Sequence, residues 1–201
     1  VPYTYTATVP AVGSFVGSTF TALAQGTTQV KATDANGFFG TTGTYDVRTY
    51  DVAVGSDQGN ALHAFTVPIT IGNPASVAFT AGDLHVSFDN AAFNFTGITT
   101  TGFSLAGTSI TSNVVGNNLY FSFGGSATIN PANGATLCRL NFVKDPLWTA
   151  GASSTLGLVS VLFNETLNAR TANGSLTLDA PASIDLSPLN ATLRAGTQQQ
   201  F

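Results

Sequence analysis

Apolar and polar positions alternate along most of the chain in short runs. In Phe65–Ile71 the apolar side chains recur at every second residue, which is the period of a strand with one buried face. Runs of the same kind lie at Thr28–Thr33, Thr44–Val54, Leu84–Phe88, Leu119–Phe123, Leu137–Val143, Leu156–Phe163 and Gly174–Leu178. They are separated by turn-forming pairs such as Asn36-Gly37, Asn73-Pro74 and Asn173-Gly174. No window has a sustained helical period, so the pattern predicts an all-β protein of sandwich type.

Composition supports that prediction and narrows the function. The 201 residues are 43% hydrophobic and 8% charged, with 15 Phe and a net charge of −4. Few charges and many aromatic residues favour a folded chain over a disordered one. No basic cluster is present to contact phosphates, so we expect no nucleic-acid partner. No apolar run reaches the length of about 18 residues that a membrane span needs, so we expect no membrane insertion.

Two polar stretches predict domain boundaries. One is the glycine-rich segment Gly55–Asn60, and the other is the short proline-containing segment Asp179–Ala182. They divide the chain into residues 1–54, 55–180 and 181–201. Val1 is not a methionine, which predicts that the chain is processed or belongs to something longer.

The middle part resembles a cohesin-like module. The residues that carry the resemblance are Phe65–Asn73, Leu84–Asn90, Phe95–Ile98, Leu137–Phe142, Phe163–Glu165 and Ala172–Leu178. The resemblance implies an antiparallel β-sandwich of the jelly-roll type over residues 55–180. It does not by itself imply a dockerin partner, since many such modules have none.

The two flanking parts resemble complementary pieces of a bacterial immunoglobulin-like (Big) domain. Phe20–Gly37 and Thr44–Val47 resemble its middle and later strands, and residues 182–201 resemble its opening strands. The resemblance implies an Ig-like sandwich over 1–54 that lacks its first strands. We expect the acceptor side chains to be Tyr5, Phe20, Val30, Tyr45 and Val47.

The last segment can supply the missing strands. Its apolar side chains are Ile184, Leu186, Leu189, Leu193 and Phe201. A sheet that lacks strands has open edges, which are templates for pairing with another chain. We therefore expect an extracellular or cell-surface structural protein that assembles with itself head-to-tail into a filament. Two alternatives stay open: the tail completes its own N-terminal domain, or the sequence is one period of a longer tandem-repeat adhesin that binds protein or polysaccharide.

Residues with catalytic chemistry are sparse. The chain has two histidines, His63 and His85, and one glutamate, Glu165, without a nucleophile motif around them. Cys138 shares one strand face with Leu140 and Phe142, so we interpret it as a small buried hydrophobic residue. We expect no enzyme activity and no cofactor.

The sequence offers two further candidate binding sites, one for a metal ion and one for carbohydrate. A single structural calcium ion would take oxygen ligands from Asp57, Asp89, Asp145 or Glu165, although turn capping explains the aspartates more simply. Trp148 is the one tryptophan and a candidate for carbohydrate stacking, but it is also suited to covering an open end of the core.

Overall fold

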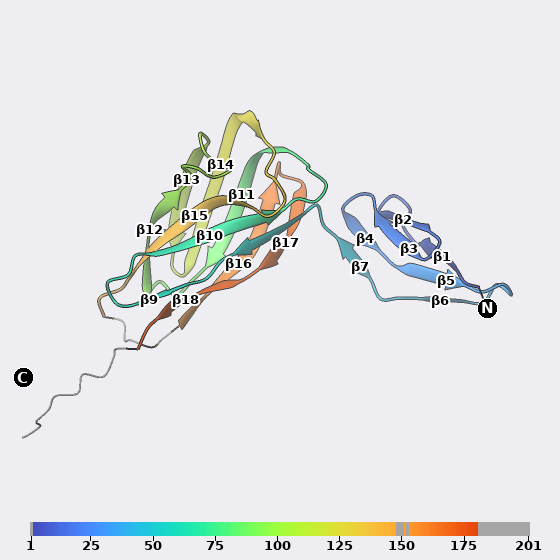
Figure 1. The fold of residues 1–201 in the computed structure, drawn as a ribbon, viewed down its shortest axis with the longest axis horizontal. Helices are drawn as coiled ribbons and strands as arrows, with labels where there is room; N and C mark the ends of the chain where they lie inside the picture. Colours follow the sequence, from blue (N-terminus) through green and yellow to red (C-terminus); the bar gives the residue numbers. More distant parts are fainter. Residues whose placement is uncertain (1, 148–150, 152, 181–201) are drawn as a thin grey trace, which may run out of the picture.

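The computed structural model describes residues 2–147, 151 and 153–180, and its regular elements are all strands. This confirms the all-β prediction. None of the residues it describes forms a helix of the length and apolar character that a membrane span requires. The strands form two bodies, a small N-terminal domain and a large sandwich (Figure 1).

The sandwich is one continuous sheet path folded around a core. Its order is β12-β15-β10-β8-β17-β16-β11-β14-β13, with β18 paired to β16 and to β9. The strands β12-β15-β10-β8 form one layer and β16-β11-β14-β13 the other, and β17 joins them (Figure 1). The bounds are β8 (Tyr50–Val54), β9 (Asp57–Gly59), β10 (Phe65–Gly72), β11 (Phe79–Ser87), β12 (Phe93–Thr99), β13 (Ser109–Val115), β14 (Asn118–Ile129), β15 (Ala135–Lys144), β16 (Ser153–Phe163), β17 (Leu167–Ala172) and β18 (Gly174–Leu178).

Strict alternation builds the sandwich core. Every second residue of β10 is buried, starting at Phe65, so the whole apolar face of that strand turns inward. An aromatic cluster fills one end of the core: Tyr50 lies edge-on to Phe163, with ring centroids 4.9 Å apart, and Phe79 stacks on Phe163 at 4.3 Å. The Tyr50 hydroxyl donates a hydrogen bond to the carbonyl of Val77, which satisfies the one polar atom of the cluster.

The first and last strands of the sandwich run parallel, which departs from the antiparallel prediction. β8 pairs with β17, and β9 pairs with β18, both in parallel. The predicted turn at Asn173-Gly174 is only a one-residue break between β17 and β18, and Gly174 lies so close to the segment between β8 and β9 that a Cβ there would overlap the Gly55 carbonyl oxygen. The hairpin lies earlier, at Asn164 and Glu165, whose positive φ angles of 47° and 64° match a type I′ turn.

The boundary predicted between residues 54 and 55 is also corrected. The run Thr44–Val54 is two strands: β7 (Tyr45–Val47) belongs to the N-terminal domain, and β8 lies between β10 and β17 in the sandwich. No residue of β7 is buried, whereas Tyr50, Val52 and Val54 of β8 are, because the chain passes from the N-terminal domain into the sandwich between the two strands. The sandwich therefore starts at Tyr50.

The N-terminal domain consists of three small sheets. β1 (Thr4–Ala7), β5 (Val30–Thr33) and β6 (Phe39–Thr41) form one sheet in the order β1-β5-β6. β2 (Gly13–Val16) pairs with β3 (Thr19–Ala22), and β4 (Gly26–Thr28) pairs with β7. The predicted strand Thr28–Thr33 is thus shared between β4 and β5, with a break at Gln29.

Hydrophobic burial differs sharply between the two bodies. Of the 29 buried hydrophobic residues in the described parts, 28 lie in the sandwich and one, Val12, lies in the N-terminal domain. A body of fewer than 50 residues is marginal even with a full core. The N-terminal domain therefore buries too few hydrophobic side chains for a core of its own to stabilise it.

Candidate functional site

An apolar groove opens in the N-terminal domain between its small sheets. It has a volume of about 340 Å³. No charged side chain lines it, and the lining comes from β1, β2, β3, β5, β7 and two connecting segments. The lining residues are Tyr5, Phe15, Ser18, Phe20, Val30, Thr42 and Tyr45.

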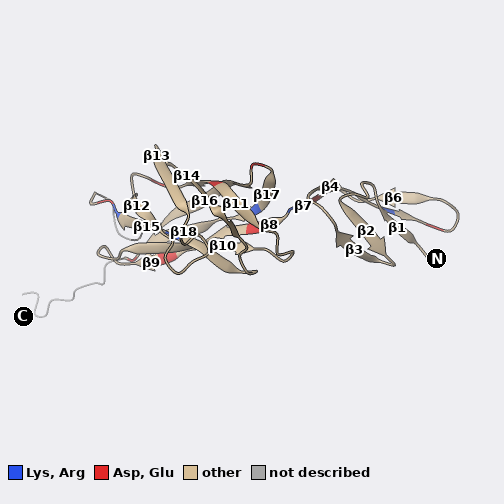
Figure 2. Cartoon of the chain, turned by 90° about the horizontal axis from the view of Figure 1, so that it is seen from above, with Lys and Arg blue, Asp and Glu red and all other residues tan. Residues whose placement is uncertain are grey.

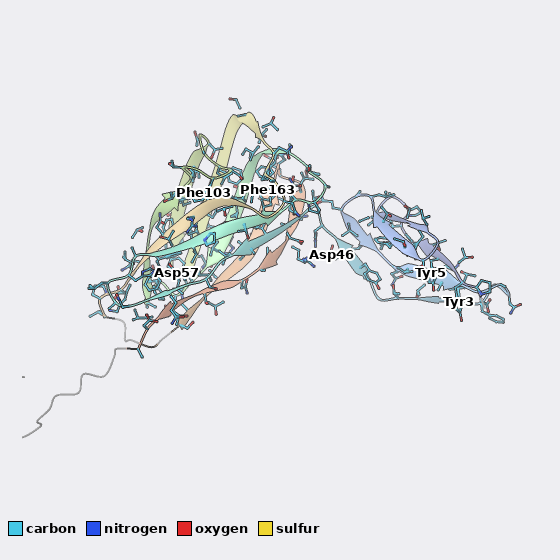
Figure 3. All side chains as sticks on the ribbon, viewed as in Figure 1. Tyr3, Tyr5, Asp46, Asp57, Phe103 and Phe163 are labelled. Atoms are coloured by element: carbon cyan, nitrogen blue, oxygen red, sulfur yellow. The ribbon has the colours of Figure 1, made fainter. Side chains whose placement is uncertain are left out.

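Three aromatic rings form the wall of the groove. Tyr5 stacks on Phe15, with ring centroids 5.9 Å apart and planes inclined by 26°, and Phe15 contacts Phe20 at 5.3 Å. The Phe20 ring lies across Gly13, where any Cβ would overlap it, so glycine at this position is what lets the ring lie flat on β2. Figure 3 shows the Tyr5 side chain among the strands of this domain, with Tyr3 farther out beside the N-terminus.

The groove is flanked by the open edges of strands in addition to its apolar side chains. Among the described strands, β1 pairs only with β5, and β7 pairs only with β4. Each therefore has one edge of N–H and C=O groups to which none of the described strands is hydrogen-bonded. Such an edge can accept a further strand, and the apolar groove would receive that strand's side chains.

Four of the five expected acceptor residues meet in this groove: Tyr5, Phe20, Val30 and Tyr45. Val47 does not line it. It lies instead at the junction, in a second hollow shared with Leu23 and Pro74, because β7 leads out of the domain at that point. The predicted set also lacks Phe15, because β2 has only four residues and its two apolar ones, Phe15 and Val16, are adjacent, so no alternation marks the strand.

The expected donor residues lie outside the described part of the chain. These are Ile184, Leu186, Leu189, Leu193 and Phe201. Trp148 also lies outside it. Their roles stay predictions.

His63 and Asp57 form the one histidine–carboxylate pair in the described residues, with His63 Nε2 3.1 Å from Asp57 Oδ2. Partial burial of Asp57 raises its pKa, but hydrogen bonds from the backbone N–H of Thr66, from His63 and from the backbone N–H of Gln58 outweigh this, so the pKa lies below its ordinary value. The His63 ring packs edge-on against Phe65. The pair fixes the loop between β9 and β10.

The remaining expected reactive groups have structural contacts. His85 points outward from β11, stacks on Tyr120 at 4.3 Å and bonds Asn118. Cys138 is fully buried in β15, and burial raises the pKa of its thiol to about 12, which leaves it protonated and inert. This confirms the prediction of a buried small hydrophobe.

The candidate calcium ligands act as turn caps or lie in turns. Asp89 accepts a hydrogen bond from the N–H of Ala91, and Asp145 accepts one from the N–H of Leu147. Glu165 lies in the β16–β17 hairpin turn. Within the residues that the structure describes, no group of three or more His, Cys, Asp or Glu side chains lies close enough to hold a metal ion.

Comparison with solved structures identifies the fold of the sandwich. A non-cellulosomal cohesin from the archaeon Archaeoglobus fulgidus matches with a TM-score of 0.54 and 18% identity, over 66% of this chain and 92% of that one. The sixth cohesin of Acetivibrio cellulolyticus scaffoldin B, solved in complex with a Cel5 dockerin, matches with a TM-score of 0.54 and 16% identity, over 65% of this chain and 99% of that one. The sandwich has the cohesin fold. The seventh ScaB type I cohesin of Pseudobacteroides cellulosolvens matches in the same way, with a TM-score of 0.54 and 18% identity over 74% of this chain and 100% of that one.

The likeness to cohesins is a likeness of fold. No protein-family model matches the sequence, and no curated protein matches it. The sandwich makes up about two thirds of the chain, which is close to the share that the cohesin structures cover. The resemblance of the N-terminal domain to a bacterial immunoglobulin-like domain stays a prediction.

Proposed function

We propose that this protein is an extracellular, non-enzymatic structural protein that assembles with itself head-to-tail. In this proposal residues 181–201 of one copy enter the groove of the N-terminal domain of the next copy and add a strand there. The groove and the near absence of a buried core around it carry the proposal.

The groove has the character of a strand acceptor. Its lining is aromatic and aliphatic, with two hydroxyl side chains and no charge, and unpaired strand edges lie beside it. A folded domain normally covers such residues with its own side chains. A strand that filled the groove would supply both the missing apolar contacts and the missing backbone hydrogen bonds.

The sequence of the last segment is suited to such a groove. Leu189, Ala191, Leu193 and Ala195 recur at every second position, with Asn190, Thr192 and Arg194 between them. A strand with this pattern has one apolar face and one polar face. Pro188 precedes it and cannot donate a ladder hydrogen bond, so the pairing strand starts after it.

Distance favours another copy over the chain's own groove. β18 pairs with the first residues of β16, at Ser153–Leu156, whereas the N-terminal domain contacts the hairpin after β16, at Thr166 and Asn168. The 11 residues of β16 separate these places by about 36 Å. A tail folding back would need about half of residues 181–201 merely to pass along the sandwich, and most of its apolar side chains would lie outside the groove.

The cohesin fold of the sandwich supports the wider part of the proposal. The neighbours from Acetivibrio cellulolyticus are protein-binding modules solved with dockerins, so a role in protein association suits the fold. The alternative is a surface module that binds a different protein or a polysaccharide. The two are separated by whether the pure protein assembles without a second component.

The test is to truncate the chain after Ala180 and compare it with the full chain by electron microscopy and sedimentation. Donation predicts filaments from the full chain and only monomers from the truncated one. A synthetic peptide of residues 181–201 should bind the truncated chain and raise the melting temperature of its N-terminal domain. The matched control is the same peptide with Leu189→Asp and Leu193→Asp, which should do neither.

Three results would contradict donation. Filaments of the truncated chain would show that the tail is not the connector. A full chain that is monomeric at all concentrations would favour fold-back or a binding module. Equal binding of the native and Asp-substituted peptides would show that the apolar groove is not the site.

A further inference from the structure

We propose that the assembly has a second contact besides the donated strand, between the tail-exit end of one sandwich and the outer end of the next copy's N-terminal domain. This inference rests on the proposed function. The tail-exit end is defined by the loops that carry Leu62 and Leu147. The outer end is defined by Tyr3, Phe38 and Phe39.

The tail-exit end displays two leucines beside the point where the chain leaves the sandwich. Leu62 is 95% exposed and Leu147 is 93% exposed, the two highest values among the large hydrophobic side chains described. The Asp179 N–H bonds the Gly59 carbonyl at 2.9 Å, and the Gly151 N–H bonds the Leu178 carbonyl at 3.0 Å. The two leucine-bearing loops are therefore held against the strand that leads into residues 181–201.

The outer end of the N-terminal domain displays three aromatic side chains. Thr4 is paired with Thr33, and Thr33 is paired with Phe39, so Tyr3, Phe38 and Phe39 lie at the same end of the β1-β5-β6 sheet. Their exposed fractions are 58%, 77% and 64%. Figure 1 shows this end of the sheet pointing away from the sandwich, and Figure 3 labels Tyr3 there. Exposed aromatic side chains are therefore concentrated at this end of the sheet, where they can be buried by a partner.

The connectivity brings these two ends together. The inner end of each N-terminal domain is occupied by its own sandwich, through the hydrogen bonds of Gln25 with Thr166 and Asn168. A donor sandwich therefore has to approach from the outer end. Residues 181–188 link Ala180 to the pairing strand that starts at Leu189, a reach of at most about 30 Å, so the donor's leucines stay near the outer end of the acceptor domain once the tail is seated.

Charged groups surround the apolar side chains at both ends. Lys31 is the one lysine or arginine before Arg48, and its Nζ lies 4.0 Å from the centre of the Phe39 ring. The tail-exit end carries the carboxylates of Asp57 and Asp179, and Figure 2 shows acidic residues near β9 and β18. Asp34 beside Phe38 and Lys144 beside the Leu147 loop carry the other sign at each end, so both ends hold both charges and the contact rests on its apolar side chains.

The experiment uses the full chain with Leu62→Ser and Leu147→Ser together. Both side chains are exposed, so the fold should persist. The matched control is Val115→Ser with Val159→Ser, two exposed valines, 58% and 55%, on sandwich strands. Sedimentation velocity gives the concentration at which the assemblies dissociate, and fluorescence anisotropy gives the affinity for the synthetic 181–201 peptide.

We expect the leucine variant to dissociate at a concentration about 100-fold higher, since the lost burial of each of the two leucines is worth about tenfold. Its affinity for the peptide should be unchanged, and the valine control should match the wild type. Assemblies of unchanged strength with normal peptide binding would overturn the end contact and leave strand donation intact. Failure of the peptide to bind, together with assembly of the truncated chain, would overturn both.

A double-mutant cycle tests whether the two ends touch each other. Phe38→Ser is combined with the leucine variant, and the three dissociation concentrations are compared with the wild type. If the side chains touch, the combined variant raises the dissociation concentration by less than the product of the two separate fold-increases. A combined loss equal to that product would show that the two ends do not meet, and would overturn the inference.

Discussion

Gln25 ties the N-terminal domain to the sandwich through its side-chain amide, and replacing it with alanine should loosen the junction. Its Nε2 donates to the Thr166 carbonyl at 2.7 Å, and its Oε1 accepts from the Asn168 N–H at 3.1 Å. The Thr49 hydroxyl donates to the same Oε1 at 3.3 Å. Gln25 thereby reaches the hairpin after β16 and the segment that connects the two bodies.

The cost of Gln25→Ala follows from these contacts. A neutral hydrogen bond contributes about 0.5–1.5 kcal/mol net, and exposed bonds lie at the low end of that range. Loss of the two bonds to the hairpin should therefore weaken the junction by about 1–2 kcal/mol. That energy corresponds to about a 5- to 30-fold rise in the population with the two bodies apart.

Limited proteolysis with trypsin measures that population. Arg48 lies between β7 and β8, and its guanidinium pairs with Asp46 at 2.6 Å. Cleavage after Arg48 should follow the opening equilibrium when reclosing is fast. We expect cleavage in Gln25→Ala to be about 5- to 30-fold faster. The matched control is Gln58→Ala, which removes an amide bonded to Asp179 at the far end of the sandwich. A rate within twofold of the wild type for Gln25→Ala would refute the reasoning, as would equal acceleration in Gln58→Ala.

Three further predictions concern stability. The pKa of Cys138 is raised from about 9 to about 12, so the stability present below pH 9 should fall by up to about 4 kcal/mol as the pH rises toward 12. In denaturant titrations, Cys138→Ala should lack this fall in the free energy of unfolding between pH 9 and pH 12. The same fall in the variant would contradict the prediction. Because the pKa of Asp57 is lowered, stability present above its ordinary pKa should be lost as the pH falls through the lower folded value, and Asp57→Asn should flatten that acid limb of the melting temperature. Glu165→Gly should stabilise the sandwich by about 0.5–1 kcal/mol in chemical denaturation, because glycine adopts the positive φ at this turn without strain, whereas Glu165→Ala should not.

The sandwich was the part of the fold most readable from sequence. Strict alternation in Phe65–Ile71 and the apolar run Leu156–Phe163 predict strands that β10 and β16 contain. The sequence could not predict the parallel pairing of β8 with β17, because alternation of apolar and polar residues indicates which face of a strand is buried and not which strand pairs with it. The boundary predicted at residue 54 rests on the glycine-rich segment Gly55–Asn60, but this segment contains β9 and its connection to β8 within one body.

The groove was readable in part. Tyr5, Phe20, Val30 and Tyr45 were identified from a resemblance, and they meet because three short strand pairs bring them together. Phe15 was missed because β2 has only four residues, too few for alternation to stand out. Val47 was included because sequence could not show that the chain turns toward the sandwich after β7.

The parallel pairs at the edge of the sandwich have a mechanical consequence. The chain enters the sandwich at Tyr50 and leaves it after Leu178, at opposite ends of one long seam formed by β8 with β17 and β9 with β18. Tension between neighbouring subunits would pull these two chain segments along the seam in opposite directions. Its four and three residue pairs, together with the ion pair of Arg170 with Asp51 at 2.8 Å, would then be strained in shear and have to fail together rather than open one after another.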